Sequence, residues 1–181
     1  YLANHLGEEV LSLEAPEVAE AVTRTQDHIE SLMRIQAVEP HGPEYFHEQL
    51  GDLLYEFCGV SRTVEGLQEG IKRIRALRDD CWRNLHIPGN PNDMNQTLEA
   101  ALRLVDYINL GELMCIDALD RDESCGAHYR MDHLTDDGEA KRDDDNWCFV
   151  SAWEPAGDGE FIRHAEPLHF DSIPLMARNY K

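Results

Sequence analysis

Apolar residues recur every three or four positions through most of the first 119 residues, which is the spacing of one face of a helix. Segments rich in proline and glycine at residues 40–43 and 88–91 interrupt this pattern. The pattern predicts helices over about residues 16–39, 43–57, 62–82 and 92–119. Asn92 or Asp93 is expected to cap the last of these helices.

Each predicted helix carries one apolar stripe. The stripes consist of Val18, Val22, Ile29, Leu32 and Met33 in the first helix, Phe46, Leu50, Leu53 and Phe57 in the second, Val64, Leu67, Ile71, Ile74 and Leu77 in the third, and Leu98, Ala101, Val105, Ile108, Leu113 and Ile116 in the fourth. The connections are short, and short connections favour antiparallel neighbours. We therefore expect a mainly α fold, an up-and-down antiparallel bundle of three to four helices.

The helical pattern ends after Asp120. Residues 117–145 contain eleven acidic residues against four basic ones, so an irregular acidic segment is expected there. Two β-prone runs, 147–153 and 160–165, flank a turn-rich stretch and predict a small β-hairpin. A third short strand is expected at residues 168–170.

These patterns predict three parts. Residues 1–119 form the helical bundle, and residues 120–146 form an acidic segment that packs on the bundle or docks a domain outside this sequence. Residues 147–181 form the hairpin subdomain and tail. The sequence opens on Tyr1 rather than Met, which suits a segment of a longer chain.

Composition narrows the function classes. The formal net charge is −20, from 36 acidic and 16 basic residues, so contact with a phosphate backbone is unfavourable and nucleic acid is not an expected partner. The apolar stretches are too short to predict a membrane-spanning helix. Five cysteines, an odd number without the spacing of a disulfide framework, indicate a reducing cytoplasm.

The densest polar motif covers residues 120–133, and one interpretation of it is a zinc site. Cys125 and His128, with Cys115 and His133 nearby, are ligand types that zinc prefers. Structural zinc sites usually have two close ligand pairs, and the second pair is missing in this sequence.

A second interpretation is nucleophilic catalysis, with Cys125 as nucleophile, His128 as base and Asp132 as the orienting acid. A third is docking, in which arginine and carboxylate groups form partly buried pairs. The residue types favour docking. The sequence contains no phosphate-binding loop and no Gly-x-Gly-x-x-Gly motif, so no catalytic, cofactor-binding or metal residue is predicted.

The segment from Arg121 to Asp132, followed by residues 142–147, resembles the carboxyl-terminal region of succinate dehydrogenase and fumarate reductase flavoproteins. In that family a Glu-Ser-Arg-Gly-Ala-His-like segment precedes an Arg-Asp-Asp-x-x-Trp-like segment, directly after a helical bundle. This sequence departs from the pattern where Cys125 replaces the usual Arg and Leu134 the usual Pro, and where residues 136–140 lengthen the link. The departures resemble the branch with a single dihaem cytochrome b anchor.

The resemblance implies a parent oxidoreductase in which hydride passes between a dicarboxylate and covalently bound FAD. Electrons would travel through an iron–sulfur subunit to or from quinone, at a membrane cytochrome b anchor on the cytoplasmic face of the inner membrane. The family's flavin-attaching and substrate-binding residues lie in other domains. None maps onto this chain, so the chain alone is expected to be inactive.

The resemblance also assigns the motif a docking role against the flavin-binding domain of the same subunit. The positions expected to dock are Glu123, Ser124, His128, Arg130, Asp132 and Trp147. In this interpretation Arg130 and Asp132 lose their solvent only in the assembled subunit. Two alternatives stay open: the related tail of L-aspartate oxidase, and an autonomous acidic helical module that binds a protein partner.

Overall fold

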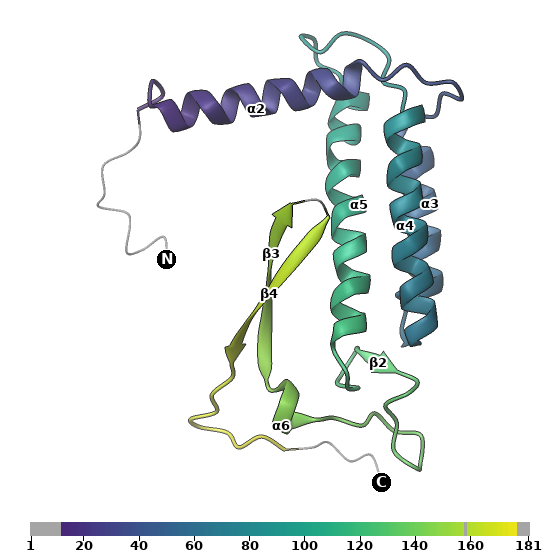
Figure 1. Ribbon diagram of the computed structural model, residues 1–181, viewed down its shortest axis with the longest axis vertical. Helices are drawn as coiled ribbons and strands as arrows, with labels where there is room; N and C mark the ends of the chain where they lie inside the picture. Colours follow the sequence, from purple (N-terminus) through teal and green to yellow (C-terminus); the bar gives the residue numbers. More distant parts are fainter. Residues whose placement is uncertain (1–11, 158, 177–181) are drawn as a thin grey trace. The chain divides into compact units, whose positions relative to one another are not determined.

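The computed structural model describes residues 12–157 and 159–176. Along the chain the elements are α2 (Pro16–Met33), α3 (Pro43–Phe57), β1 (Ser61–Arg62), α4 (Val64–Asn84), α5 (Gln96–Asp120), β2 (Tyr129–Arg130), α6 (Asp144–Trp147), β3 (Phe149–Gly157) and β4 (Glu160–Pro167) (Figure 1). The predicted fold class, mainly α with a small antiparallel strand pair near the carboxyl end, is confirmed. Among the described helices, none combines the length and apolar character needed to cross a bilayer.

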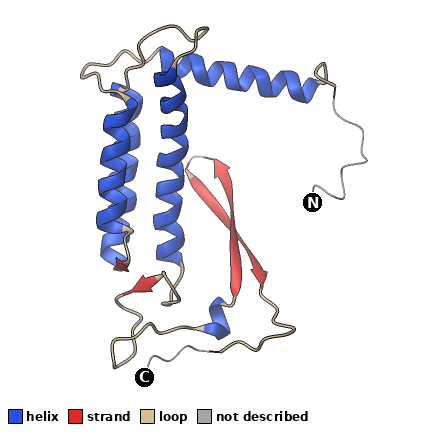
Figure 2. Ribbon diagram, turned by 180° about the vertical axis from the view of Figure 1, so that it is seen from behind, coloured by secondary structure: helices blue, strands red, loops and turns tan. Residues whose placement is uncertain are grey.

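The chain forms two compact units, and each takes part of α3, α4 and α5. The first unit comprises Tyr1–Asp52 and Arg73–Gly111, and the second comprises Leu53–Lys72 and Glu112–Lys181. Within each unit the segments of these three helices lie side by side (Figure 2). The division into bundle, acidic segment and hairpin subdomain at residues 119 and 146 stays a prediction.

The helix starts follow local capping chemistry. Asn95, and not Asn92 or Asp93, caps α5: its Oδ1 accepts a hydrogen bond from the backbone N–H of Leu98 at 3.0 Å, and its Nδ2 donates to the carbonyl of Pro88 at 2.9 Å. Asn92 and Asp93 lie instead in a turn closed by Asn90. The α4 helix begins after Thr63, whose Oγ1 accepts from the backbone N–H of Gly66 at 3.0 Å.

In the first unit, most of the predicted stripe residues of α3, α4 and α5 are buried. Its buried apolar side chains are Leu32, Phe46, Leu50, Ile74, Cys81, Leu85, Ile87, Leu98, Ala101, Leu104 and Ile108. The stripe of α2 is the exception, because among its described residues only Leu32 is buried and Val22 is 50% exposed.

The second unit combines a small apolar contact with buried polar groups. Leu67, Cys115 and Ala118 are buried there, together with the polar or charged side chains Glu112, Glu123, Ser124 and Arg130. Gly70 of α4 lies in close contact with α3, since a Cβ atom at Gly70 would meet the Cβ of Phe57 at 2.8 Å. The parallel pair β1–β2 matches Ser61 to Tyr129 and Arg62 to Arg130, a pairing that periodicity did not predict.

The β-hairpin is confirmed, with different limits. Pairing between β3 and β4 continues into the predicted loop as far as Gly157 and Glu160, with a register shift after Pro155. Trp147, expected in the first strand, is the last residue of α6. The strand expected at residues 168–170 is absent from the described structure, where Leu168 makes one ladder-like bond, from its N–H to the carbonyl of Cys148 at 3.1 Å. Pro167 before it has no N–H to donate to a ladder.

Two helical glycines should respond to alanine in opposite directions. Gly70→Ala should lower the free energy of unfolding by about 1–3 kcal/mol, because the new methyl group would overlap Phe57. Gly51→Ala, in α3 with nothing within 4 Å of its Cβ position, should raise it by about 0.5–1 kcal/mol through helix propensity. Urea unfolding of both variants measures the difference. Equal stabilisation by both substitutions would contradict the close helix contact at Gly70.

Candidate functional site

Arg130 lies at the centre of the polar strip, which we define as residues 121–147. The parallel pairing of β2 with β1 places it opposite Arg62, and its side chain is only 2% exposed. A buried guanidinium is costly unless its N–H groups are hydrogen-bonded and its charge is paired. The surroundings of Arg130 meet both requirements.

The guanidinium of Arg130 closes the carboxyl end of α5. Its Nη1 lies 3.2 Å from the carbonyl oxygen of Ala118, 3.1 Å from that of Leu119 and 3.3 Å from that of Arg121. These carbonyls belong to the last turn of the helix and the residue after it, where no intrahelical donor is available. A cation there also complements the helix dipole. Arg130 is therefore a side-chain cap.

The other side of the guanidinium binds Asp132 in a bidentate pair. Nε donates to Oδ1 at 2.9 Å, and Nη2 donates to Oδ2 at 2.7 Å. Hydrogen bonding to Arg130 holds the pKa of the Asp132 carboxyl below its usual range. The expectation that Arg130 stays solvated until a partner assembles is wrong, since the carboxyl end of its own α5 helix already buries it.

Ser124 and Glu123 are likewise satisfied inside the chain. The Ser124 hydroxyl accepts from the backbone N–H of Arg130 at 2.8 Å and donates to the carbonyl of the same residue at 3.1 Å. Glu123, 2% exposed, accepts from Nε of Arg121 at 2.9 Å and from the backbone N–H of Asp143 at 2.8 Å. These bonds connect both halves of the polar strip.

His128 is held as a neutral ring. Nη1 of Arg62 lies 2.9 Å from Nδ1, and Arg62 can only donate, so Nδ1 is the acceptor. Nε2 then carries the proton and donates to the carbonyl of Arg121 at 2.9 Å. Burial lowers the pKa of His128 below its ordinary value, and the positive charges of Arg62, Arg121 and Arg130 lower it further.

The zinc site and the catalytic triad, which were two alternative interpretations of the motif, are not assembled. His128 has both ring nitrogens engaged by Arg62 and Arg121, and the Cys115 thiol is hydrogen-bonded to Cys58. Neither side chain is therefore available for the metal set proposed with Cys125 and His133. The catalytic triad is not formed for the same reason, because neither ring nitrogen of His128 is free to accept the proton of the Cys125 thiol.

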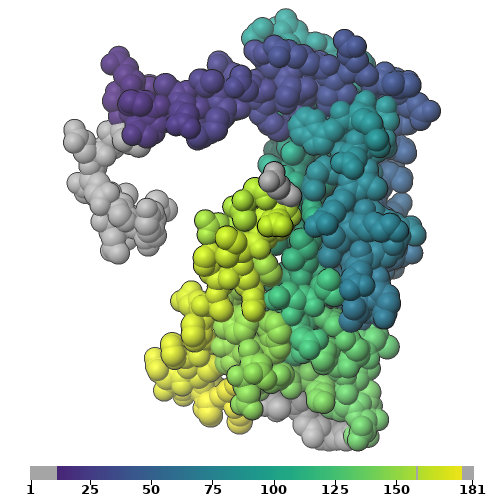
Figure 3. All heavy atoms as spheres, in the orientation of Figure 1, coloured from purple at the N-terminus to yellow at the C-terminus, as the bar shows by residue number. Residues whose placement is uncertain are grey.

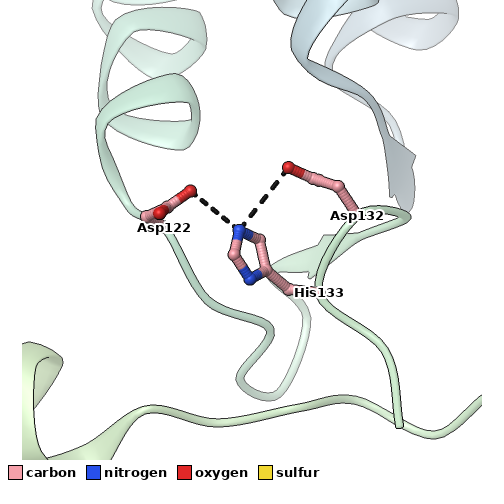
Figure 4. Close-up of side chains that lie close together, drawn as sticks. All are labelled: Asp122, Asp132 and His133. Carbon is pink, nitrogen blue, oxygen red and sulfur yellow. Dashed lines mark hydrogen bonds and ion pairs between the residues drawn. The ribbon is translucent and has the colours of Figure 1, made fainter. Parts of the chain in front are cut away.

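Asp122, Asp132 and His133 form a cluster beside the cap (Figure 4). Nε2 of His133 lies 2.7 Å from Oδ1 of Asp122 and 3.5 Å from Oδ2 of Asp132. Among the described residues, this is the group whose ligand atoms approach one another closely enough to hold a metal ion, all within 4.8 Å. Both oxygens of Asp132 already accept from Arg130, whose fixed positive charge opposes a cation there. Ion pairing accounts for the cluster.

Trp147 links the polar strip to the hairpin. Its carbonyl accepts from Nη2 of Arg121 at 3.1 Å, and the guanidinium carbon of Arg163 lies 5.3 Å from its ring centroid. Two further bonds connect the hairpin to α5: the indole N–H of Trp153 donates to Asp117 at 2.7 Å, and Arg163 lies 3.3 Å from Asp120. The hairpin is thus fixed by polar contacts.

Sequence reasoning missed two partners. Arg62 holds His128 although 66 positions separate them, and no periodic signal connects such residues. Cys58 and Cys115 form a buried thiol pair, in which their hydrogen bond lowers the pKa of Cys58 to about 7 and raises the pKa of Cys115. An apolar residue pattern at helical spacing does not distinguish a buried cysteine from any other small apolar side chain.

Removing the cap should destabilise the chain by itself. Arg130→Ala should lower the free energy of unfolding by about 3 kcal/mol or more, because it leaves Asp132 and three helix-end carbonyls without their donor. Arg130→Lys should not restore it, since an ammonium lacks the planar fork. Arg24→Ala, at an exposed i,i+4 pair with Glu20, is the control and should cost at most about 0.5 kcal/mol. Similar losses for Arg130→Ala and Arg24→Ala in urea would contradict the cap.

His128 should make stability fall in weak acid. A lowered folded-state pKa means that the neutral ring stabilises the fold, fully above the ordinary value of 6.5. This contribution is lost as the pH falls below 6.5 toward the folded-state pKa, because protonation removes the acceptor for Arg62. His128→Asn should lack this part of the pH dependence, whereas His86→Asn, at an exposed histidine, should retain it. Parallel pH profiles for wild type and His128→Asn would refute the assignment.

Comparison with known proteins gives a family for this arrangement. Residues 47–180 match the family model described as fumarate reductase flavoprotein C-term. The fumarate reductase flavoprotein subunit of Escherichia coli K12 is 31% identical over 133 residues, covering 74% of this chain and 21% of that protein. The corresponding subunit of Helicobacter pylori 26695 is 28% identical over 162 residues, covering 86% of this chain and 21% of that protein. The chain thus spans about a fifth of these relatives.

One weaker sequence match is to a different enzyme, whereas the structural match is again to a fumarate reductase. The L-aspartate oxidase of Yersinia pestis is 28% identical over 83 residues, which is 44% of this chain. A solved variant of Escherichia coli quinol fumarate reductase shares the fold, with a TM-score of 0.74 and 23% identity over 95% of this chain and 28% of that one. The family model covers well over half of the chain. The chain therefore belongs to the family of fumarate reductase flavoprotein carboxyl-terminal domains.

Proposed function

We propose that this chain is the carboxyl-terminal helical domain of a flavoprotein subunit that interconverts succinate and fumarate. The observation that carries the proposal is the family match over residues 47–180 together with the Escherichia coli fumarate reductase relative. Because the chain corresponds to 21% of that relative, the reaction belongs to the whole subunit. The chain itself has a structural role.

The described residues do not fit a flavin. Dinucleotide phosphates bind where a glycine-rich turn leads from a strand into an open helix N-terminus. Here the junction between β1 and α4 has no glycine, and Thr63 already caps the first turn of α4. FAD would bind in the remainder of the parent subunit, and no catalytic step is assigned to residues of this chain.

The docking role of the polar strip now rests on its more exposed members. Glu123, Ser124 and Arg130 are buried and satisfied within the chain, so they shape the surface from inside. Asp132, with 43% of its side chain exposed, and Trp147, which is partly exposed, are the positions that remain available to the flavin-binding domain. His128, half-buried, closes the turn at residues 125–128 through backbone bonds with Cys125.

The proposal extends to the partners of the parent complex. An iron–sulfur subunit would carry electrons between the flavin and quinone, and a cytochrome b subunit would anchor the complex to the cytoplasmic face of the inner membrane. The solved relatives support partners of this kind, since one of them is described as a quinol–fumarate reductase with menaquinol molecules.

L-aspartate oxidase is the second candidate for the parent activity. It is favoured by one observation, the match of the Yersinia pestis enzyme to 44% of this chain. The fumarate reductase relatives match up to 86% of it, so succinate–fumarate chemistry is the better supported reaction. An autonomous binding module lacks any corresponding match among these relatives.

The chain alone should be colourless and inactive, whereas the polypeptide that contains it should be yellow. Flavin absorbance, succinate-dependent dye reduction and fumarate-dependent oxidation of a reduced viologen are measured on both. The parent should show both activities, because one flavin site serves the two directions of the reaction. An L-aspartate-dependent oxidase assay is the matched control.

The outcomes separate the candidates. Flavin or succinate-dependent activity in the chain alone would overturn its structural role. A parent that oxidises L-aspartate and neither oxidises succinate nor reduces fumarate with an artificial donor would assign the second candidate. A parent without flavin would exclude both reactions.

A further inference from the structure

The apolar stripe of α2 is covered at one end and bare at the other. At its carboxyl end Leu32 is 1% exposed, and the ring of His28 lies 6.2 Å from that of Trp82 in an edge contact. These contacts lie within the first unit. They attach the last turns of α2 to the end of α4.

Toward its amino end the same stripe continues uncovered. Val18, Ala21, Val22 and Thr25 follow one another at helical spacing and line a shallow apolar hollow with Glu17 and Gln26. Val22 is 50% exposed, and no other described segment of the first unit covers the side of α2 in view (Figure 3). In proteins most of the stability of a helix comes from the packing of its apolar face, so a bare stripe on α2 is expected to have a partner.

We infer that the bare half of this stripe is where the flavin-binding part of the same subunit packs. The inference rests on the proposed function. The structural match to quinol fumarate reductase covers 95% of this chain, so it includes most of α2, yet only 28% of the matched chain. The uncovered stripe is also continuous with an interface already formed inside the first unit.

Charge argues against a second copy of this chain as the occupant. The helix carries four acidic residues, Glu17, Glu20, Asp27 and Glu30, against one basic residue, Arg24. The whole chain has a formal charge of −20, so two copies would meet with strong like-charge repulsion. The surface fits an apolar patch with a basic rim.

A pair of neighbouring substitutions tests this surface. Val22→Asp places a carboxylate on the stripe, and Thr23→Asp places the same group one position away, on the exposed side of the helix. In the chain alone both should leave the melting temperature nearly equal to wild type. In the full subunit Val22→Asp should lower it by several degrees more than Thr23→Asp, because the carboxylate would be buried in the packed interface.

Amide hydrogen exchange of the wild-type protein is a second test, and it does not depend on whether a variant folds. Backbone amides of residues 18–25 should exchange at least about tenfold more slowly in the full subunit than in the chain alone. Unchanged exchange, or equal effects of the two substitutions in the full subunit, would overturn the docking surface. Destabilisation by Val22→Asp in the chain alone would also overturn it, because residues of this chain would then cover the stripe.

Flavin content separates this inference from the proposed function. A yellow subunit that interconverts succinate and fumarate but shows no contrast between Val22→Asp and Thr23→Asp overturns only the docking surface. A colourless polypeptide that shows the contrast overturns the proposed reaction and retains the packing of the remaining chain on α2.

Discussion

The guanidinium of Arg130 organises the second unit because it meets two needs of the backbone at once. The last carbonyls of α5 have no partners of their own, and the chain that leaves the helix must be turned back. Arg130 donates to the carbonyls of Ala118 and Leu119 on one side and to the carboxylate of Asp132 on the other. Its burial is tolerable only with all of these bonds in place, so the position of the strip is tightly determined.

The remaining polar contacts of the second unit extend from this cap. Ser124 binds both backbone groups of Arg130, and Glu123 connects the segment to Asp143 at the start of α6. The hairpin is joined to the same helix end through Trp153 and Asp117. An acidic segment that composition alone cannot distinguish from a disordered one is therefore ordered by specific charge-assisted bonds.

The two exposed features of the chain differ in chemistry. In the polar strip the side chains with the most hydrogen bonds, such as Arg130 and Glu123, are buried and stabilise the positions of α5 and the hairpin. The side chains that the strip exposes to solvent are mainly carboxylates. The α2 helix presents valine, alanine and threonine at its amino end and buries almost nothing there. Since apolar burial is the larger source of association energy, the α2 surface is better suited than the strip to hold a large neighbouring domain.

Local pattern was sufficient for the four long helices and the hairpin of this protein and insufficient for the partners of their side chains. The spacing of Phe46 and Leu50, or of Leu98 and Ala101, already specifies which helix face is buried, because a helix repeats every 3.6 residues. The motif around Glu123 and Ser124 likewise identified the family before any coordinates.

Only the tertiary structure decided which of several chemically similar side chains caps a helix, becomes buried or forms a given hydrogen bond. Three residues near the start of α5 could cap it, and the turn at Asn90 leaves that role to Asn95. A charged residue in an acidic segment is expected to be solvated, yet the helix end above it buries Arg130. The contact between Arg62 and His128 joins positions 66 residues apart. Periodicity describes the neighbours of a residue along one element, whereas these interactions depend on which elements meet in space.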